Sequence, residues 1–176
     1  METFLFLDTE TTGFKKSGPL MQHRQARVCQ IAMILTDAKG KTLSQFSSLI
    51  KPKDWTIHPK AQDVHGISDM DCIMFGIDQR KVVEMFIEYG RFNPTVVAHN
   101  EEFDRAMMEI ELAYFGIDNP DIAPWYCTMK ANTHITNGKL PKLDIVLQHY
   151  CNRSLGNDAH DALEDARACR DIYFAM

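Results

Sequence analysis

The chain lacks the features that mark secreted, zinc-stabilised and membrane-spanning proteins. Its five cysteines are an odd number and none forms a Cys-x-x-Cys pair, which argues against a disulfide framework and a structural zinc site. No apolar run approaches the length of a membrane span. No signal-peptide pattern precedes the first apolar run, which begins at Thr3. These absences predict a cytoplasmic protein with no membrane partner.

An excess of basic residues is missing as well. The chain has 19 Lys and Arg against 24 Asp and Glu, and its net charge is −5. This balance argues against broad, non-specific nucleic-acid binding, which usually needs a basic face. It does not exclude a nucleic-acid enzyme, because a bound cation reverses the field of the acids that ligate it. The length of 176 residues and the 45% hydrophobic content fit a single domain over residues 1–176.

The order of the predicted elements indicates an α/β domain with a mixed central sheet flanked by helices. Strands are predicted at Thr3–Leu7, Val28–Thr36, Thr42–Ile50, Thr95–Ala98 and Trp125–Met129. Helices are predicted after Ser68, around Val82–Tyr89, from a cap at Asn100 to about Phe115, and over Lys142–Tyr150 and Asp161–Ala175. The first strand is expected to turn at Thr9–Gly13, and the first three strands to form an antiparallel meander.

Two acids near the start of the chain are the first sign of chemistry. Asp8 and Glu10 stand two residues apart on an extended segment, so their side chains leave the same face. At a separation of about 4 Å and an effective dielectric near 20, their repulsion would be about 4 kcal/mol without a cation. The alternative is a solvated turn after the strand.

Two further acids and a histidine occupy similarly unusual positions. Asp104 lies in the first turn of its predicted helix, where the helix dipole alone also favours an anion. Asp165 interrupts a stripe of small and apolar residues, where a carboxylate needs either an arginine or a metal as partner. His160 precedes that helix and is either a cap or loop residue or a group that takes a proton from a metal-bound water. The stripe consists of Ala162, Ala166, Cys169, Ile172 and Tyr173.

The four carboxylates and the histidine fit one mechanism when they are taken together. Carboxylates can bridge two divalent cations, of which one activates water and the other stabilises the leaving oxygen of a phosphate ester. An all-oxygen ligand set favours Mg²⁺, with Mn²⁺ able to substitute, over Zn²⁺. The sequence therefore indicates a metal-dependent phosphoryl-transfer enzyme.

Three motifs with fixed local spacing resemble those of the DEDDh exonucleases, a family that includes the proofreading subunit of bacterial DNA polymerase III and ribonuclease T. The motifs are Asp8-Thr9-Glu10-Thr11-Thr12-Gly13, His99-Asn100-x-x-Phe103-Asp104 and His160-x-Ala162-x-x-Asp165, with a weaker match at Val64-His65-Gly66-Ile67. The matches follow the family order and span nearly the whole chain. The resemblance implies a ribonuclease-H-like fold and 3′-to-5′ hydrolysis that releases nucleoside 5′-monophosphates.

The resemblance also implies roles for individual residues. The metal ligands would be Asp8, Glu10, Asp104 and Asp165, and the general base would be His160. The substrate contacts would come from Thr9, Thr11, Phe14, His65, Ile67, Asn100 and Phe103. Within this set, Phe14 and Phe103 resemble aromatic positions that stack on bases, although the helical spacing of Phe103 equally suits a core residue.

Several alternatives stay open from the sequence. The segment from Phe14 to Arg27 matches no family motif, and is either a substrate-guiding loop with Lys15, Lys16, Arg24 and Arg27 or a surface excursion. The expected substrate is a single-stranded 3′ end, with DNA favoured over RNA, and a polymerase or repair partner is expected. Other hypotheses are a non-catalytic, polymerase-associated module of the same fold, an RNA-directed member of the family, and a nuclease that cuts internally. Nothing in the sequence decides the oligomeric state.

Overall fold

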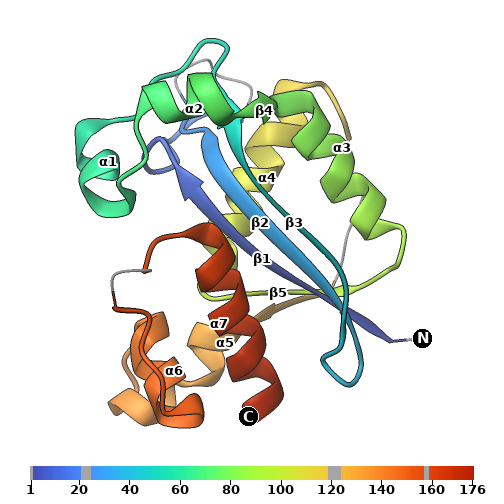
Figure 1. The fold of residues 1–176 in the computed structure, drawn as a ribbon, viewed down its shortest axis with the longest axis vertical. Helices are drawn as coiled ribbons and strands as arrows, with labels where there is room; N and C mark the ends of the chain where they lie inside the picture. Colours follow the sequence, from blue (N-terminus) through green and yellow to red (C-terminus); the bar gives the residue numbers. More distant parts are fainter. Residues whose placement is uncertain (1, 21–24, 119–123, 157–158) are drawn as a thin grey trace.

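The computed structural model describes residues 2–20, 25–118, 124–156 and 159–176. Its strands form one six-stranded sheet in the order β4-β3-β2-β1-β5-β6 (Figure 1). The strands are β1 (Thr3–Thr11), β2 (Val28–Asp37), β3 (Thr42–Lys51), β4 (Ile77–Asp78), β5 (Thr95–Ala98) and β6 (Trp125–Cys127). The first three strands pair antiparallel, whereas β5 runs parallel to β1 and β6 parallel to β5. The predicted mixed sheet is therefore confirmed.

Helices cover both faces of this sheet (Figure 1). They are α1 (Pro59–His65), α2 (Asp69–Phe75), α3 (Gln79–Gly90), α4 (Glu101–Tyr114), α5 (Thr128–Ala131), the 3₁₀ turn η1 (Thr133–Thr136), α6 (Leu143–Cys151) and α7 (Ala162–Ala175). The helices α3 and α4 pack on one face, and α7 packs on the other with α6 behind it. No helix in the described ranges is long and apolar enough to cross a membrane.

The central strand β1 divides its side chains between these two layers. Leu5 and Leu7 point into the core with α3 and α4, whereas Phe4 and Phe6 point into the core with α7. All four side chains are buried because strands lie on both sides of β1 and helices cover both of its faces. Since side chains alternate along a strand, the residues that continue the Phe4 and Phe6 series also face α7.

The structure corrects the predicted end of the first strand. We expected the strand to end at Leu7 and the chain to turn at Thr9–Gly13, but β1 continues to Thr11. The reason is that β2 is long enough to pair with it throughout, from Thr3 opposite Asp37 to Thr11 opposite Val28. The acids of this segment therefore lie on a paired strand and not in a turn.

Other boundaries differ from the prediction in smaller ways. The strand expected over Trp125–Met129 stops at Cys127, whose Sγ accepts a hydrogen bond from the Lys130 backbone N–H at the start of α5. Ser68 forms a capping box with Asp71, as its sequence predicts. The helix α1 and the short strand β4 were not predicted.

Candidate active site

The end of β1 presents the first two predicted ligands to α7. Asp8 and Glu10 lie on the same face as Phe4 and Phe6, and they pair across the sheet with Ala32 and Gln30 of β2. Both carboxylates are partly buried. Because β1 is paired with β2 along this stretch, the sheet fixes the backbone positions of both acids. The prediction that their side chains share one face is confirmed.

Asp104 approaches the same strand end from the first turn of α4. Its side chain is 3% exposed, and the Thr9 hydroxyl donates a hydrogen bond to its Oδ1 over 2.8 Å. Burial raises the pKa of Asp104 to about 7, while the hydrogen bond from Thr9 opposes this rise. A carboxylate that only stabilised the helix dipole would have no need of this buried place, since Glu101 and Glu102 lie nearer the helix start.

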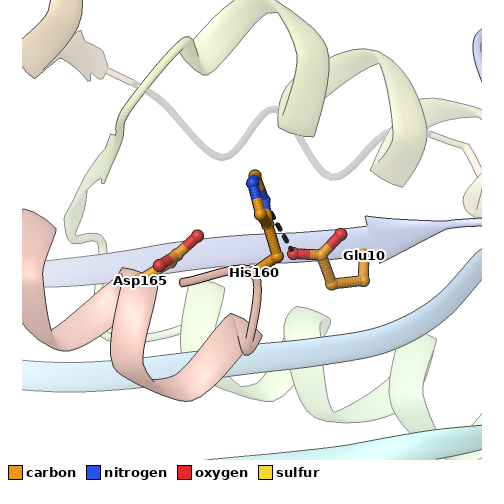
Figure 2. A group of neighbouring side chains, drawn as sticks. All are labelled: Glu10, His160 and Asp165. Atoms are coloured by element: carbon orange, nitrogen blue, oxygen red, sulfur yellow. Dashed lines mark ion pairs between the residues drawn. The ribbon is translucent and has the colours of Figure 1, made fainter. Parts of the chain in front are cut away.

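The residue before the α7 cap, His160, and Asp165 in the first turn of α7 lie beside Glu10 (Figure 2). His160 has a positive φ of 67°, and its half-exposed ring places Nδ1 3.9 Å from Glu10 Oε1. One potential ligand atom from each of Glu10, His160 and Asp165 lies within 4.8 Å of the other two. Segments at opposite ends of the sequence therefore meet at one point.

Asp165 has no basic partner among the residues that the structure describes. Its carboxylate is 8% exposed, and its Oδ1 is buried with no hydrogen-bond partner among the described residues. No Lys or Arg of the described residues forms an ion pair with the Asp165 carboxylate. The alternative of a buried salt bridge at Asp165 is thus contradicted within the described ranges.

Burial and mutual repulsion raise the pKa values of the clustered carboxyl groups. Burial, followed by repulsion from Asp104 and Asp165, raises the pKa of Asp8 well above its usual range. Burial and repulsion from Asp165 raise the pKa of Glu10 to about 8. Burial likewise raises the pKa of Asp165 to about 6. Together with the unpartnered Oδ1 of Asp165, these shifts show an oxygen-rich site whose negative charge a divalent cation would balance.

The segment after α1 is tied to the end of β1 through His65. The Ile67 backbone N–H donates to His65 Nδ1 over 3.1 Å, and His65 Nε2 lies 3.2 Å from the Thr11 carbonyl oxygen. Because Nδ1 accepts, Nε2 carries the proton and donates to Thr11. Burial lowers the pKa of His65, which favours this neutral ring. Gly66 makes the connection with a φ of 74°, a conformation that suits glycine.

The two predicted stacking residues, Phe14 just after β1 and Phe103 in the first turn of α4, lie beside each other. Phe14 is 83% exposed, whereas Phe103 is half-buried against the core. Their rings meet edge to face with centroids 6.2 Å apart. Phe103 therefore has the core contact that its helical spacing predicts, and it also supports the exposed Phe14 ring.

Asn100 lies at the expected position but does not cap α4 as expected. Its φ is 79°, and its side chain accepts no capping hydrogen bond. Residues that cap helices usually have extended backbone, whereas Asn100 lies in the left-handed region, which asparagine tolerates better than most residues. Its neighbour His99 is held by Thr128 Oγ1 and the Pro141 carbonyl, each at 3.0 Å.

The comparisons with known proteins place this geometry in a family. The sequence model of the family described as Exonuclease matches residues 5–173, almost the entire chain. The chain belongs to the exonuclease family. The predicted membership is confirmed.

The curated exonuclease relatives are bacterial. The chain is 28% identical to DNA polymerase III subunit epsilon of Salmonella typhimurium over 179 residues, which cover 98% of this chain and 70% of that protein. It is 28% identical to the same subunit of Escherichia coli K12 over 176 residues, with 98% and 70% covered. Both alignments extend over nearly all of this chain.

Solved structures share the fold of this family member. The zinc-bound complex of Escherichia coli exonuclease I with single-stranded DNA aligns with a TM-score of 0.80 at 19% identity, over 99% of this chain. Exonuclease I of Methylocaldum szegediense aligns with a TM-score of 0.72 at 21% identity, also over 99% of this chain. The chain spans about 40% of the length of these solved proteins. The ribonuclease-H-like fold is thereby confirmed.

The structure of this exonuclease-family chain also corrects one interpretation of the Phe14–Arg27 segment. Arg27 was a candidate for guiding substrate, but it is 3% exposed and forms a buried ion pair with Glu111 at 2.7 Å. Arg24 lies outside the described residues. Gln25 is also buried and bonds to the backbone of Lys16. Lys15 and Lys16 are the exposed cations of the described part of this loop.

Two residues beside the site were missed from the sequence. Asp161 caps α7 and contributes to the repulsion at Asp8 and Glu10. Gln30 of β2 bonds to the start of α7. An aspartate directly before a helical stripe is a capping signal that could have identified Asp161. Gln30 gives no such signal, because its partners lie more than 130 residues away.

Proposed function

We propose that this chain is a metal-dependent 3′-to-5′ exonuclease that shortens single-stranded nucleic acid and releases nucleoside 5′-monophosphates. The observation that carries the proposal is the convergence of acids from β1, α4 and α7 without a Lys or Arg partner in the described ranges. Membership of the exonuclease family supports the same reaction class. The names of the relatives, a DNA polymerase III subunit and exonuclease I, support action on DNA ends.

Four carboxylates are proposed as the ligands of two Mg²⁺ ions. They are Asp8, Glu10, Asp104 and Asp165. Their hard oxygen donors suit Mg²⁺ and Mn²⁺, and divalent-metal dependence is general in the exonuclease family. When bound, the cations supply charge neutralisation for the phosphate and its leaving oxygen. The raised carboxyl pKa values and the unpartnered Asp165 oxygen support this assignment, because they are what ligands without their cation should show.

His160 is proposed as the general base. In the proposed reaction, water attacks the phosphorus of the 3′-terminal nucleotide, and the imidazole takes the proton that this water loses. The bond between phosphorus and the O3′ of the preceding nucleotide breaks, and that oxygen takes a proton from solvent. The ring is half-exposed and near Glu10, so it can pass its proton to solvent after each turnover. Its positive φ is a strained conformation, of the kind that concentrates at functional sites.

The proposed substrate contacts surround the end of β1. The side chains of Thr9 and Thr11 bond within the protein, to Asp104 and to the Gly13 carbonyl, so the backbone of this segment would meet the terminal 3′-OH. The segment His65–Ile67 would border the terminal nucleotide, with Asn100 supporting the opposite side. Phe14, backed by Phe103, would stack on a base, which gives affinity without sequence preference. We propose DNA in preference to RNA, with a polymerase or repair assembly as partner.

A nuclease assay with matched ends tests this proposal. A 5′-labelled single-stranded DNA should give a ladder that shortens from the 3′ end in Mg²⁺ and no product in EDTA. A circular DNA of the same sequence should resist, because it has no 3′ end. Cleavage of the circle would instead identify an internal nuclease, and the absence of any Mg²⁺-dependent product would indicate a non-catalytic module. Duplex DNA and RNA of the same sequence rank the substrate classes.

A further inference from the structure

The side chain of Gln30 joins the central sheet to the start of α7. Gln30 lies on β2 directly opposite Glu10 in the β1–β2 register. Its Nε2 donates a hydrogen bond to Asp161 Oδ2 over 3.0 Å, and its Oε1 accepts one from the Ala162 backbone N–H over 3.1 Å. Both polar ends of the amide are therefore committed to the residues that begin α7.

The donors and acceptors of this link fit in one arrangement. Asp161 Oδ1 already accepts the N–H groups of Leu163 and Glu164 at 3.0 and 3.2 Å, so its Oδ2 is left to receive the Gln30 amide. If the Gln30 amide were reversed, its N–H₂ would face the Ala162 N–H and its carbonyl would face a carboxylate. Neither of these pairs can form a hydrogen bond while Asp161 is ionised. The glutamine consequently holds α7 in one position relative to β2.

The residues next to this link belong to the proposed catalytic group. His160 immediately precedes Asp161, and Asp165 donates its backbone N–H to the Asp161 carbonyl over 2.9 Å in the first turn of α7. Glu10, on the neighbouring strand, lies 3.9 Å from His160. The link from Gln30 therefore adjoins the segment whose His160 and Asp165 side chains lie beside Glu10 (Figure 2).

We propose that Gln30 is a positioning residue of the active site, which holds His160 and Asp165 against Glu10 through Asp161 and Ala162. The inference rests on the proposed exonuclease function for the roles of the residues that are positioned. Gln30 acts on them through hydrogen bonds and not by touching substrate. Because catalytic groups must be placed to a fraction of an ångström, loosening the start of α7 lowers turnover more than substrate binding.

Two single substitutions test the link. Gln30→Met keeps the approximate length of the side chain and removes both hydrogen bonds without adding charge. Gln30→Glu keeps the acceptor for Ala162 but places a carboxylate oxygen against Asp161. Each should lower kcat about 10- to 100-fold, the range for residues that support a site from behind its ligands, with KM changed by about twofold or less. Gln45→Glu is the matched control, because Gln45 lies on β3 and contacts α7 through Arg167 at 3.4 Å, outside the acid cluster.

A double substitution reverses the donor and acceptor. In Gln30→Glu combined with Asp161→Asn, the asparagine amide donates to the new carboxylate while its carbonyl caps α7 as before. The pair also regains its original net charge. The double variant should recover most of the lost kcat, whereas Asp161→Asn alone should lower kcat. If the charge beside Glu10 were all that mattered, Asp161→Asn alone would leave kcat unchanged or raise it, and that result would overturn the inference.

A measurement that needs no turnover separates this inference from the proposed function. The imidazole Cε1–H signal of His160 in an NMR spectrum, assigned by its loss in His160→Ala, reports the surroundings of that ring. It should shift in Gln30→Met and return in the double variant, while thermal unfolding shows that each variant is folded. Absence of nuclease activity in the unmodified chain would refute the proposed function and leave this test intact. An unmoved His160 signal together with full kcat in Gln30→Met would refute the positioning role.

Discussion

Two buried acids on different helices, Glu111 of α4 and Asp165 of α7, have opposite surroundings. Glu111 on α4 is 1% exposed and accepts hydrogen bonds from Arg27 Nε and Nη2 at 3.0 and 2.7 Å, from the Val28 N–H at 2.9 Å and from Gln79. Asp165 on α7 is 8% exposed and leaves one oxygen unpartnered within the described ranges. The fold therefore supplies an arginine where Glu111 joins elements together, whereas no Lys or Arg of the described residues pairs with Asp165.

This difference distinguishes a buried carboxylate that stabilises the fold from buried carboxylates that are proposed to bind a cation. A buried carboxylate with an arginine and further donors needs no other ion. A cluster of acids with raised pKa values and no Lys or Arg partner is costly, and its retention makes sense where a ligand balances it. The two groups should consequently respond in opposite ways to substitution, to pH and to added metal.

The largest effect on activity is expected at Asp165, whose Oδ1 has no hydrogen-bond partner among the described residues. Asp165→Asn should lower kcat beyond the ~100-fold range of residues that only support ligands, because it removes a proposed ligand oxygen. Mn²⁺ affinity, measured by calorimetry, should fall with it. Stability of the metal-free protein should be unchanged or higher, since a buried charge is removed. The control is Asp171→Asn on the same helix, where the carboxylate is paired with Arg153 and Arg170. Equal Mn²⁺ affinity in Asp165→Asn would contradict the ligand assignment.

The acid with partners should show the reverse pattern. Glu111→Ala should destabilise the fold by about 3–5 kcal/mol, because it leaves the buried Arg27 charge unpaired. Chemical denaturation measures this change, and Mn²⁺ affinity of the folded fraction should be retained. Glu109→Ala, on the same helix, removes a more exposed carboxylate that pairs with Arg105 and should cost about 0–1 kcal/mol. A similar cost in both variants would show that the Arg27 pair contributes no more than a surface contact.

The sequence allows the acids of the proposed active site to be recognised more fully than the Arg27–Glu111 ion pair. Asp165 breaks an apolar stripe on a single helix, and Asp8 and Glu10 repeat at the period of a strand, so local patterns expose them. Glu111 and Arg27 are 84 residues apart and each has an unremarkable local setting. Their pairing depends on how α4 docks on β2, which tertiary packing decides and local periodicity does not encode.

The same reasoning explains the errors at element boundaries. The chain was expected to turn at Thr9–Gly13 because polar residues and a glycine follow Leu7, but pairing with β2 extends the strand to Thr11. Asn100 was expected to cap α4, yet its left-handed backbone prevents this. In both places the local preference yields to a tertiary arrangement that brings functional residues to the strand end.

His160 belongs to the proposed site but is not a proposed metal ligand. Its removal should therefore lower turnover without weakening metal binding. His160→Ala should lower kcat by about 10²–10⁴-fold, the usual contribution of a general base. Mn²⁺ affinity should stay nearly unchanged, as measured by calorimetry on the same preparation. His149→Ala, in which an exposed ring beside Tyr150 on α6 is removed, serves as the control. Unchanged turnover in His160→Ala would exclude it as the base.

The acid cluster should also make stability depend on pH when metal is absent. The folded pKa values of Glu10, Asp104 and Asp165, about 8, 7 and 6, lie above the value near 4 of an unfolded carboxyl group. The folded state therefore binds more protons than the unfolded state. The contribution of these three groups to the free energy of unfolding is fully present below about pH 4 and is lost as pH rises through about 6–8. In EDTA, the melting temperature should be lower at about pH 8 than at about pH 5, and Mg²⁺ should reduce this difference. A melting temperature that rises over this interval in EDTA would contradict the assigned shifts.

The smallest effect is expected at the exposed ring outside both acid groups. Phe14→Ala should raise KM for single-stranded DNA by about tenfold, since one stacked base contributes roughly 1–3 kcal/mol. Its stability should barely change because the ring is 83% exposed and meets Phe103 only at its edge. Phe92→Ala, which truncates a ring that is 58% exposed near the start of β5, is the matched control. If kcat falls in Phe14→Ala while KM is unchanged, the ring positions the end of the substrate that is cut. That result would contradict the division in which the acids act in the chemical step and the aromatic residues act in substrate binding.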